Sequence, residues 1–172
     1  MHTRAIRKKS AASFEEMKPV CQVLILHEDF PAYARAVELC RQLMERHASE
    51  MDFSIKCWSF IELADPNCAR HAAKSGGSAR VILLSLSTAL PWEVERWLRS
   101  QADFRSRQEG VLALLLNQRE APAPGRKESV DWLRALAAQL GLKFQLLVPG
   151  ETVHIFRPPH PPMSSHPARV KA

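Results

Sequence analysis

A set of polar residues directly follows three apolar runs in this chain, and their side chains are of kinds that carry chemistry. These residues are His27, Glu28, Asp29, Ser85, Ser87, Thr88 and Asn117. Glu28 and Asp29 offer the hard oxygen ligands that a divalent cation such as Mg²⁺ takes in proteins. The hydroxyls of the second group are able to bind a phosphate where a helix begins. Together the residues define a candidate pocket, with Glu28 and Asp29 as its candidate metal ligands.

Simpler structural roles compete with this chemistry. An acidic pair ahead of a helix commonly caps it, and Asp29 stands directly before a helical pattern. A single histidine such as His27 at the end of a strand is usually only hydrogen-bonded. No G-x-G-x-x-G, P-loop or G-x-S-x-G motif occurs in the chain. The acids after the first run would repel a phosphate, which disfavours a flavin site of the flavodoxin type. The sequence therefore leans against an enzyme, and Mg²⁺ is the one candidate cofactor.

Apolar runs alternate with helical patterns along the chain, as they do in β-α repeats. We expect strands at 23–26, 53–61, 81–84, 111–116 and 144–148, and helices at 31–48, 65–74, 92–101 and 128–140. Such alternation predicts parallel strands joined by right-handed crossovers. The predicted fold class is α/β: a three-layer, doubly wound sheet of five mainly parallel strands in the order 2-1-3-4-5. We further expect an antiparallel edge strand at 152–156 and no fifth helix.

Patterns within these elements give more local expectations. The apolar stripe of the first helix contains Tyr33, Val37, Cys40, Leu43, Met44 and His47. The pair Gly76-Gly77 should end the second helix. Trp92, Trp97 and Trp132 are expected to pack against the core, and one of them on an exposed face would mark a partner surface. The 4 cysteines form no C-x-x-C pair, and we expect them to be buried free thiols.

The two ends of the chain differ in composition from the middle. We assign residues 1–18 to a flexible basic arm, 19–157 to the α/β domain and 158–172 to a proline-rich disordered tail, with Met17 as an alternative start. Most of the net charge of +6 lies in the ends rather than in the domain, so nucleic-acid binding is unfavoured. No targeting or membrane-spanning segment is recognisable, and we expect a cytoplasmic protein.

Three stretches resemble the receiver domain of bacterial response regulators. Residues 26–30 (Leu-His-Glu-Asp-Phe) are similar to that family's first strand, which ends in an acidic pair. Residues 81–85 (Val-Ile-Leu-Leu-Ser) are similar to the strand that carries the phosphoacceptor aspartate. Residues 147–149 (Leu-Val-Pro) are similar to the lysine-proline step after the fifth strand. The resemblance covers roughly residues 19–149 and implies a CheY-like, flavodoxin-like fold.

The same resemblance implies a degenerate site. Glu28 and Asp29 would fall on the magnesium-binding acids, but Ser85 stands where the phosphoacceptor aspartate belongs. Asn117 falls near the family's hydroxyl residue, and Val148 replaces the lysine. A serine is a poor nucleophile unless a base lies beside it. The resemblance therefore implies a receiver-like domain that is not phosphorylated in the usual way.

Three functions stay open at this stage. The first is a non-catalytic regulatory or protein-interaction module, which acts through a protein partner or as a homodimer. The second is a small ligand-binding protein or enzyme that uses residues 27–29 together with Ser85 or Ser87. The third is weak nucleic-acid binding through the basic arm. The first two require that the first and third strands lie side by side, because only then do residues 27–29 approach residues 85–88.

Overall fold

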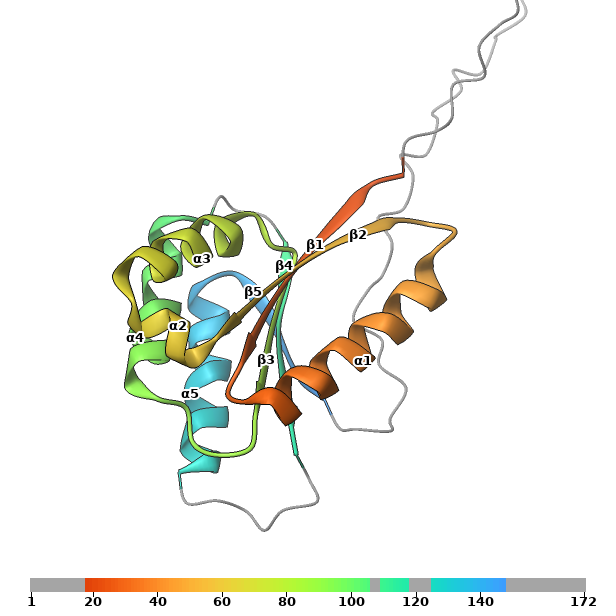
Figure 1. Cartoon of the computed structure of the whole chain (residues 1–172). Helices are drawn as coiled ribbons and strands as arrows, with labels where there is room; N and C mark the ends of the chain where they lie inside the picture. Colours follow the sequence, from red (N-terminus) through yellow and green to blue (C-terminus); the bar gives the residue numbers. More distant parts are fainter. Residues whose placement is uncertain (1–17, 106–108, 118–124, 148–172) are drawn as a thin grey trace, which may run out of the picture.

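The protein, described here from a computed structural model, contains a five-stranded parallel sheet with the strand order β2-β1-β3-β4-β5 (Figure 1). The structure describes residues 18–105, 109–117 and 125–147. The strands are β1 (Val20–His27), β2 (Asp52–Ser59), β3 (Val81–Leu86), β4 (Gly110–Leu116) and β5 (Leu142–Leu147). This strand order is that of flavodoxin-like doubly wound folds. The predicted fold class and strand order are confirmed.

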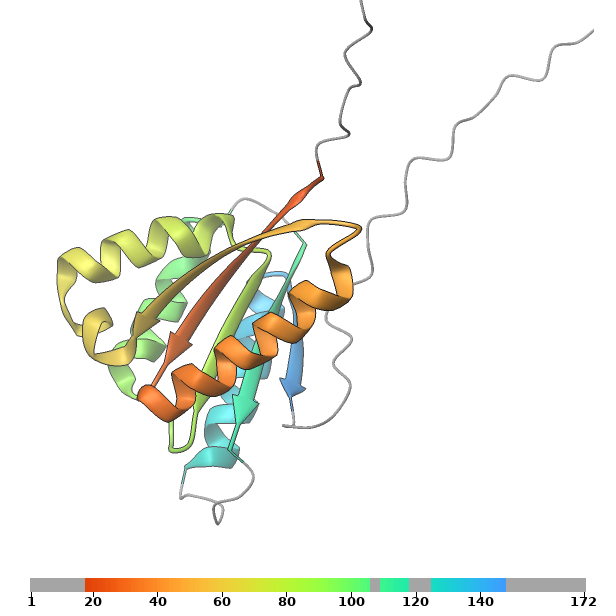
Figure 2. The ribbon, with the colours of Figure 1, turned by 45° about the vertical axis from the view of Figure 1, so that its right-hand side comes forward.

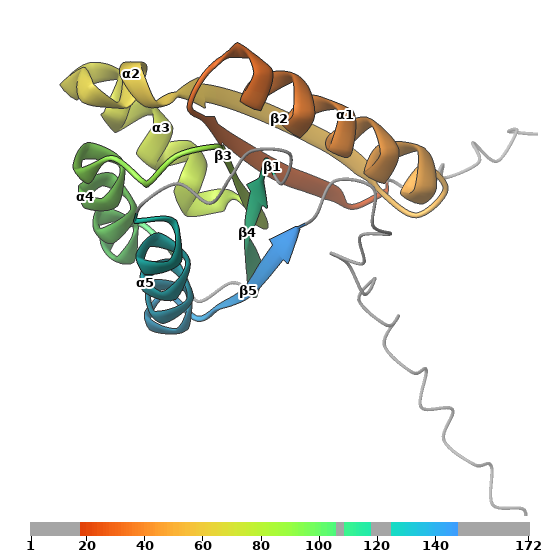
Figure 3. The same cartoon turned by 90° about the horizontal axis from the view of Figure 1, so that it is seen from below.

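Helices cover both faces of the sheet, which gives the predicted three layers (Figures 2 and 3). They are α1 (Phe30–His47), α2 (Phe60–Ala64), α3 (Pro66–Ser78), α4 (Trp92–Ser100) and α5 (Arg126–Gln139), with a 3-10 turn η1 at Gln101–Asp103. Helix α1 lies on one face, and α2 to α5 lie on the other (Figure 3). None of the helices within the described ranges is long and apolar enough to cross a membrane. The predicted edge strand at 152–156 lies outside the described residues. The same holds for the prediction that no helix follows the fifth strand.

Strand β3 lies at the centre of the sheet, and every one of its residues is buried. Side chains that alternate along the strands enter two separate cores. Leu26, Leu84 and Leu114 belong to the core under α3, α4 and α5. Ile25 and Leu83 belong to the core under α1. Because both faces of the inner strands are covered, their sequences are continuous apolar runs, which is why these strands were readable from the sequence.

Helix α1 packs on the sheet through a stripe that matches the predicted one only at Cys40 and Leu43. Its buried residues are Ala32, Ala36, Cys40 and Leu43. Val37 and Met44, which we expected to face the core, are each 37% exposed. The alanines let the helix approach the sheet closely, and this rotates the larger side chains toward the solvent. The prediction gave too much weight to side-chain size and too little to the space between helix and sheet.

The predicted second helix does not end at Gly76-Gly77, because α3 continues through both glycines to Ser78. A Cβ atom on Gly76 would lie 2.2 Å from Oε1 of the buried Gln101. A Cβ on Gly77 would lie 2.8 Å from the backbone oxygen of Phe104. The glycines therefore serve close packing inside a helix rather than helix termination.

The predicted second strand is also too long, since β2 ends at Ser59 and α2 begins at Phe60. Ser59 and Glu62 form a capping box: the Ser59 hydroxyl accepts from the Glu62 N–H, and the Glu62 carboxylate accepts from the Ser59 N–H at 2.7 Å. These two bonds satisfy N–H groups at the start of the helix, so they turn the chain there. The apolar side chains of Phe60 and Ile61 had favoured a longer strand.

The cysteines do not all share the buried setting that we predicted. Cys21 and Cys40 are buried, but Cys68 is half-buried and Cys57 is exposed on the edge strand β2. All four are free thiols. Burial raises the pKa of the Cys40 thiol to about 12. Because the thiolate is the nucleophile, Cys40 is chemically protected in the folded protein.

In the native protein at pH 8, we expect a thiol reagent such as DTNB to modify Cys57 much faster than Cys40. With its pKa near 12, Cys40 carries only about one thiolate in ten thousand molecules at that pH. Peptide mapping after a short labelling pulse measures the two rates. Denaturant should make both thiols react equally. Equal rates in the native protein would contradict the burial of Cys40 between α1 and the sheet.

Candidate functional site

The carboxyl ends of β1 and β3 lie side by side, as the candidate pocket requires. The strands pair in parallel, with His27 opposite Ser85. The Glu28 N–H donates to the Ser85 carbonyl at 3.1 Å, which continues the pairing past the end of β1. Residues 27–29 and 85–88 are therefore brought together. Asn117 is half-buried after β4, and β3 separates that strand from β1.

The Glu28 carboxylate holds the loop that follows β3. It accepts a hydrogen bond from the Ser87 N–H at 2.7 Å and one from the Thr88 N–H at 3.3 Å. The Thr88 hydroxyl donates to the other carboxylate oxygen. Backbone N–H groups in such a loop are able to bind an anion. Here the Glu28 carboxylate already accepts the hydrogen bonds of those N–H groups.

Asp29 caps helix α1. Its Oδ1 accepts from the Ala32 N–H at 2.8 Å, as predicted for a helix start. His27 lies beside it, with Nδ1 3.2 Å from the Asp29 carbonyl oxygen and its ring 5.1 Å from that of Tyr33, centroid to centroid. The described residues contain no group of three or more His, Cys, Asp or Glu side chains placed to hold a metal ion. Each of the two candidate metal ligands has a separate structural partner.

Ser85 is completely buried and lies within β3, one residue before its end, rather than after the strand as predicted. Its hydroxyl donates to the Ala32 carbonyl oxygen of α1 at 2.8 Å. The hydroxyl proton is thus engaged by a backbone carbonyl rather than by a side-chain base that would activate the oxygen. Ser85 joins the first turn of α1 to the centre of the sheet.

Two arginines that the sequence analysis missed converge on Ser87. Arg35 of α1 donates from Nη2 to the Ser87 hydroxyl at 3.1 Å, and Arg126 of α5 donates from Nη2 to the Ser87 carbonyl at 2.7 Å. The Nε atoms of both arginines are buried, and neither has a hydrogen-bond partner among the described residues. Arg126 is the first residue of α5, where the helix dipole disfavours a cation. That unfavourable position was the signal in the sequence for a role of Arg126 outside its own helix.

Ser129 is a second missed residue of this region. Its hydroxyl accepts from the Leu90 N–H at 3.1 Å and donates to the Gly125 carbonyl at 3.0 Å. Gly125 precedes α5 with a φ of 78°, a conformation that glycine adopts without strain. The loop after β3 is therefore bound by Glu28 at one end and by Ser129 at the other.

The geometry does not suit a flavin phosphate. Only Glu28 and Asp29 separate β1 from α1, and both carry negative charge. Asp29 already accepts an N–H from the first turn of α1, which a phosphate would need. A phosphate placed there would meet two carboxylates and one fewer donor.

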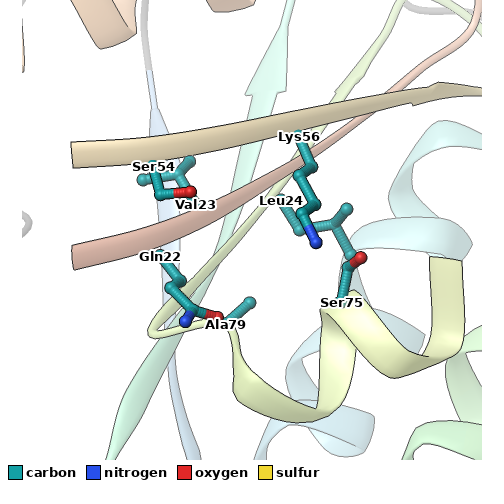
Figure 4. Close-up of a pocket in the computed structure, with 7 residues that line it drawn as sticks. All are labelled: Gln22, Val23, Leu24, Ser54, Lys56, Ser75 and Ala79. Carbon is teal, nitrogen blue, oxygen red and sulfur yellow. The ribbon is translucent and has the colours of Figure 1, made fainter. Parts of the chain in front are cut away.

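Two hollows of the described surface lie away from the strand ends. One, of about 10 Å³, lies between β1, β2 and α3, where Lys56 reaches from β2 toward Ser75 (Figure 4). That volume holds about one water molecule. The other is a groove of about 240 Å³ between α3 and α4. Only the second has room for the side chains of a partner.

Comparison with solved structures finds similarity at low sequence identity. A flavodoxin-like domain of a Synechococcus protein is 16% identical, with a TM-score of 0.48, over 77% of this chain and 85% of that one. Two-electron reduced flavodoxin from Megasphaera elsdenii is 17% identical, with a TM-score of 0.44, over 73% and 84%. A solute-binding protein of an ABC transporter from Burkholderia multivorans is 10% identical, with a TM-score of 0.33, over 76% and 60%. No family model matches the chain, and no curated protein matches it in sequence.

Proposed function

We propose that this chain is a non-catalytic regulatory or protein-interaction module with a receiver-like fold, and that it is not phosphorylated in the usual way. The observation that carries the proposal is the state of Ser85. By the resemblance it stands where the receiver family has its phosphoacceptor; it is completely buried, and its hydroxyl donates to the Ala32 carbonyl. A side chain in that state has no access to a phosphodonor.

The two acids beside it support the same conclusion. A receiver uses such acids to hold Mg²⁺, whose charge offsets that of the phosphoryl group. Glu28 instead accepts from Ser87 and Thr88, and Asp29 accepts from Ala32. These carboxylates are thus committed to the backbone donors of a loop and a helix, and a bound cation would compete with those hydrogen bonds. The strand ends therefore serve stability, and recognition belongs to another surface.

Incubation of the full chain with Mg²⁺ and acetyl phosphate should leave its intact mass unchanged. Among the described strand-end residues, Ser85 is buried, the Glu28 carboxylate accepts from Ser87 and Thr88, and Asp29 caps α1. A receiver domain of known activity, treated in parallel, is the positive control. A hydroxylamine-sensitive gain of one phosphoryl group, mapped to Asp29 or Glu28, would overturn the proposal.

A second candidate, a binding protein for a small anion, rests on the two arginines at Ser87. Their unpartnered Nε atoms would gain partners from a bound phosphate or carboxylate. In the same set of experiments, melting temperatures are measured with inorganic phosphate, nucleotides, flavin mononucleotide and Mg²⁺. A specific ligand raises the melting temperature with concentration. The interaction-module proposal expects no such rise. A rise lost in Arg35→Gln would favour the anion-binding protein.

A further inference from the structure

The groove between α3 and α4 has an apolar floor and a charged rim. Its lining residues are Leu63, Pro66, Ala69, Arg70, Ala73, Glu93, Arg96, Trp97, Ser100 and Phe104. Its volume of about 240 Å³ lies below the roughly 300–1,000 Å³ of typical small-molecule sites. The space fits one or two side chains rather than a cofactor.

Small residues on α3 create this space. Ala69 and Ala73 are four residues apart, so they lie on one face of the helix, and both line the groove. The next positions along that face, Gly76 and Gly77, closely approach Trp97, Gln101 and Phe104. The Trp97 indole N–H donates to the Ala69 carbonyl at 2.9 Å, which ties α4 to α3 across the floor. The groove thus results from the way α3 and α4, which are hydrogen-bonded to each other, pack together.

The charges around the groove are mainly positive. Helix α3 contains Arg70 and Lys74 and no acidic residue. Across the groove, Arg96 is exposed and its guanidinium lies 5.0 Å from the centre of the Trp92 ring, which is itself 61% exposed. Glu93 is the one carboxylate among the lining residues. Two arginines therefore face one acid around an apolar floor.

The geometry points to a peptide site: the α3–α4 groove binds a short segment of a protein partner in which an apolar side chain is flanked by carboxylates. The apolar side chain fills the space over Ala69, Ala73 and Trp97, and the carboxylates pair with Arg70 and Arg96. Arginine suits this role because its planar guanidinium binds a carboxylate through two hydrogen bonds. The inference rests on the proposed function as an interaction module and names the chemistry of its partner.

The test is an NMR titration of the full ¹⁵N-labelled chain. The probe is a pool of acetylated hexapeptides in which one Leu, Phe or Trp is flanked on both sides by Glu or Asp. We expect the largest shift changes at the Trp97 indole N–H and at backbone amides of α3 and α4. A matched pool with Lys in place of the acids should give none there. Binding should weaken as salt is raised, because the rim charges are exposed.

Variants assign the binding to the groove. Because Arg70 and Arg96 are exposed, the double variant Arg70→Glu/Arg96→Glu should fold and bind at least tenfold more weakly. Arg70→Lys/Arg96→Lys should keep part of the affinity, and Arg134→Glu on α5 should keep all of it. Absence of shifts at the groove, equal shifts from the lysine pool, or equal shifts from oligo(dT) would overturn the inference. The acetyl phosphate experiment does not depend on any of these outcomes. If the groove binds no peptide, that experiment still tests the proposal that the chain is a module that is not phosphorylated.

Discussion

Replacement of Ser85 by aspartate is expected to destabilise the protein by about 3–5 kcal/mol at neutral pH, although it restores the residue type of a receiver. Ser85 is completely buried and donates to the Ala32 carbonyl at 2.8 Å. An ionised carboxylate at this position has no proton to donate, loses its hydration and faces the carbonyl oxygen. The substituted side chain would therefore be an uncompensated buried charge.

The loss of stability in Ser85→Asp should depend on pH. Burial raises the pKa of a carboxyl, so folded Ser85→Asp would bind its proton more tightly than the unfolded chain does. Stability should thus be greatest below the ordinary aspartate pKa of about 3.9 and should fall as the pH rises above it. Urea unfolding from pH 4 to pH 7 measures the trend against the parent protein.

Two controls separate charge from size. Ser85→Ala removes one hydrogen bond and should cost about 1 kcal/mol without the added pH dependence. Ser85→Asn has nearly the volume of aspartate but no charge. If Ser85→Asp and Ser85→Asn lose the same stability at every pH, the position is hydrated and the proposed role of Ser85 is wrong.

Replacement of Glu28 by alanine is expected to cost about 1.5–3 kcal/mol, the range for hydrogen bonds to a charged group. The change removes the acceptor of the Ser87 and Thr88 N–H groups, bonded at 2.7 and 3.3 Å. Amide hydrogen exchange should accelerate at these two residues, while the central strand β3 keeps its protection. Urea unfolding and exchange monitored by NMR measure both effects.

Glu45→Ala is the matched control, because Glu45 is an exposed acid whose ion pair with Arg41 lies on the surface of α1. Such a pair contributes about 0–1 kcal/mol. The stability loss of Glu28→Gln should lie between those of Glu28→Ala and Glu45→Ala, because the glutamine amide oxygen still accepts one of the two N–H bonds. A Glu28→Ala protein as stable as Glu45→Ala, with unchanged exchange at Ser87, would show that the carboxylate does not hold the loop.

Much of the fold was predictable because it depends on patterns that are local in sequence. Continuous apolar runs identified the buried strands, and Asp29 before Pro31 identified the start of α1. The proximity of residues 27–29 to 85–88 followed from the strand order alone. Helix and strand boundaries that depend on contacts between elements were predicted wrongly. At Gly76-Gly77, for example, glycine is required because atoms of a neighbouring segment leave no room for a Cβ, and not because the helix ends there.

The candidate site was predictable in position but not in the state of its side chains. Sequence placed Ser85 at the end of a strand, where we expected access to a pocket. Its burial depends on how closely α1 approaches the sheet, and that distance is set by alanines 50 or so residues earlier in the chain. Arg35 was missed because nothing in its neighbouring sequence distinguishes a half-buried guanidinium from an exposed one. Its target, Ser87, lies 52 residues away.

The position of Ser87 has a mechanical consequence. Arg35 reaches it from the helix on one face of the sheet, and Arg126 reaches it from a helix on the opposite face. Ser87, a single loop residue, thus accepts hydrogen bonds from helices on both faces of the sheet. A displacement of this loop would disturb the hydrogen bonds of α1 and α5 at the same residue, so the two outer layers are connected here at the rim of the sheet and not only through its interior.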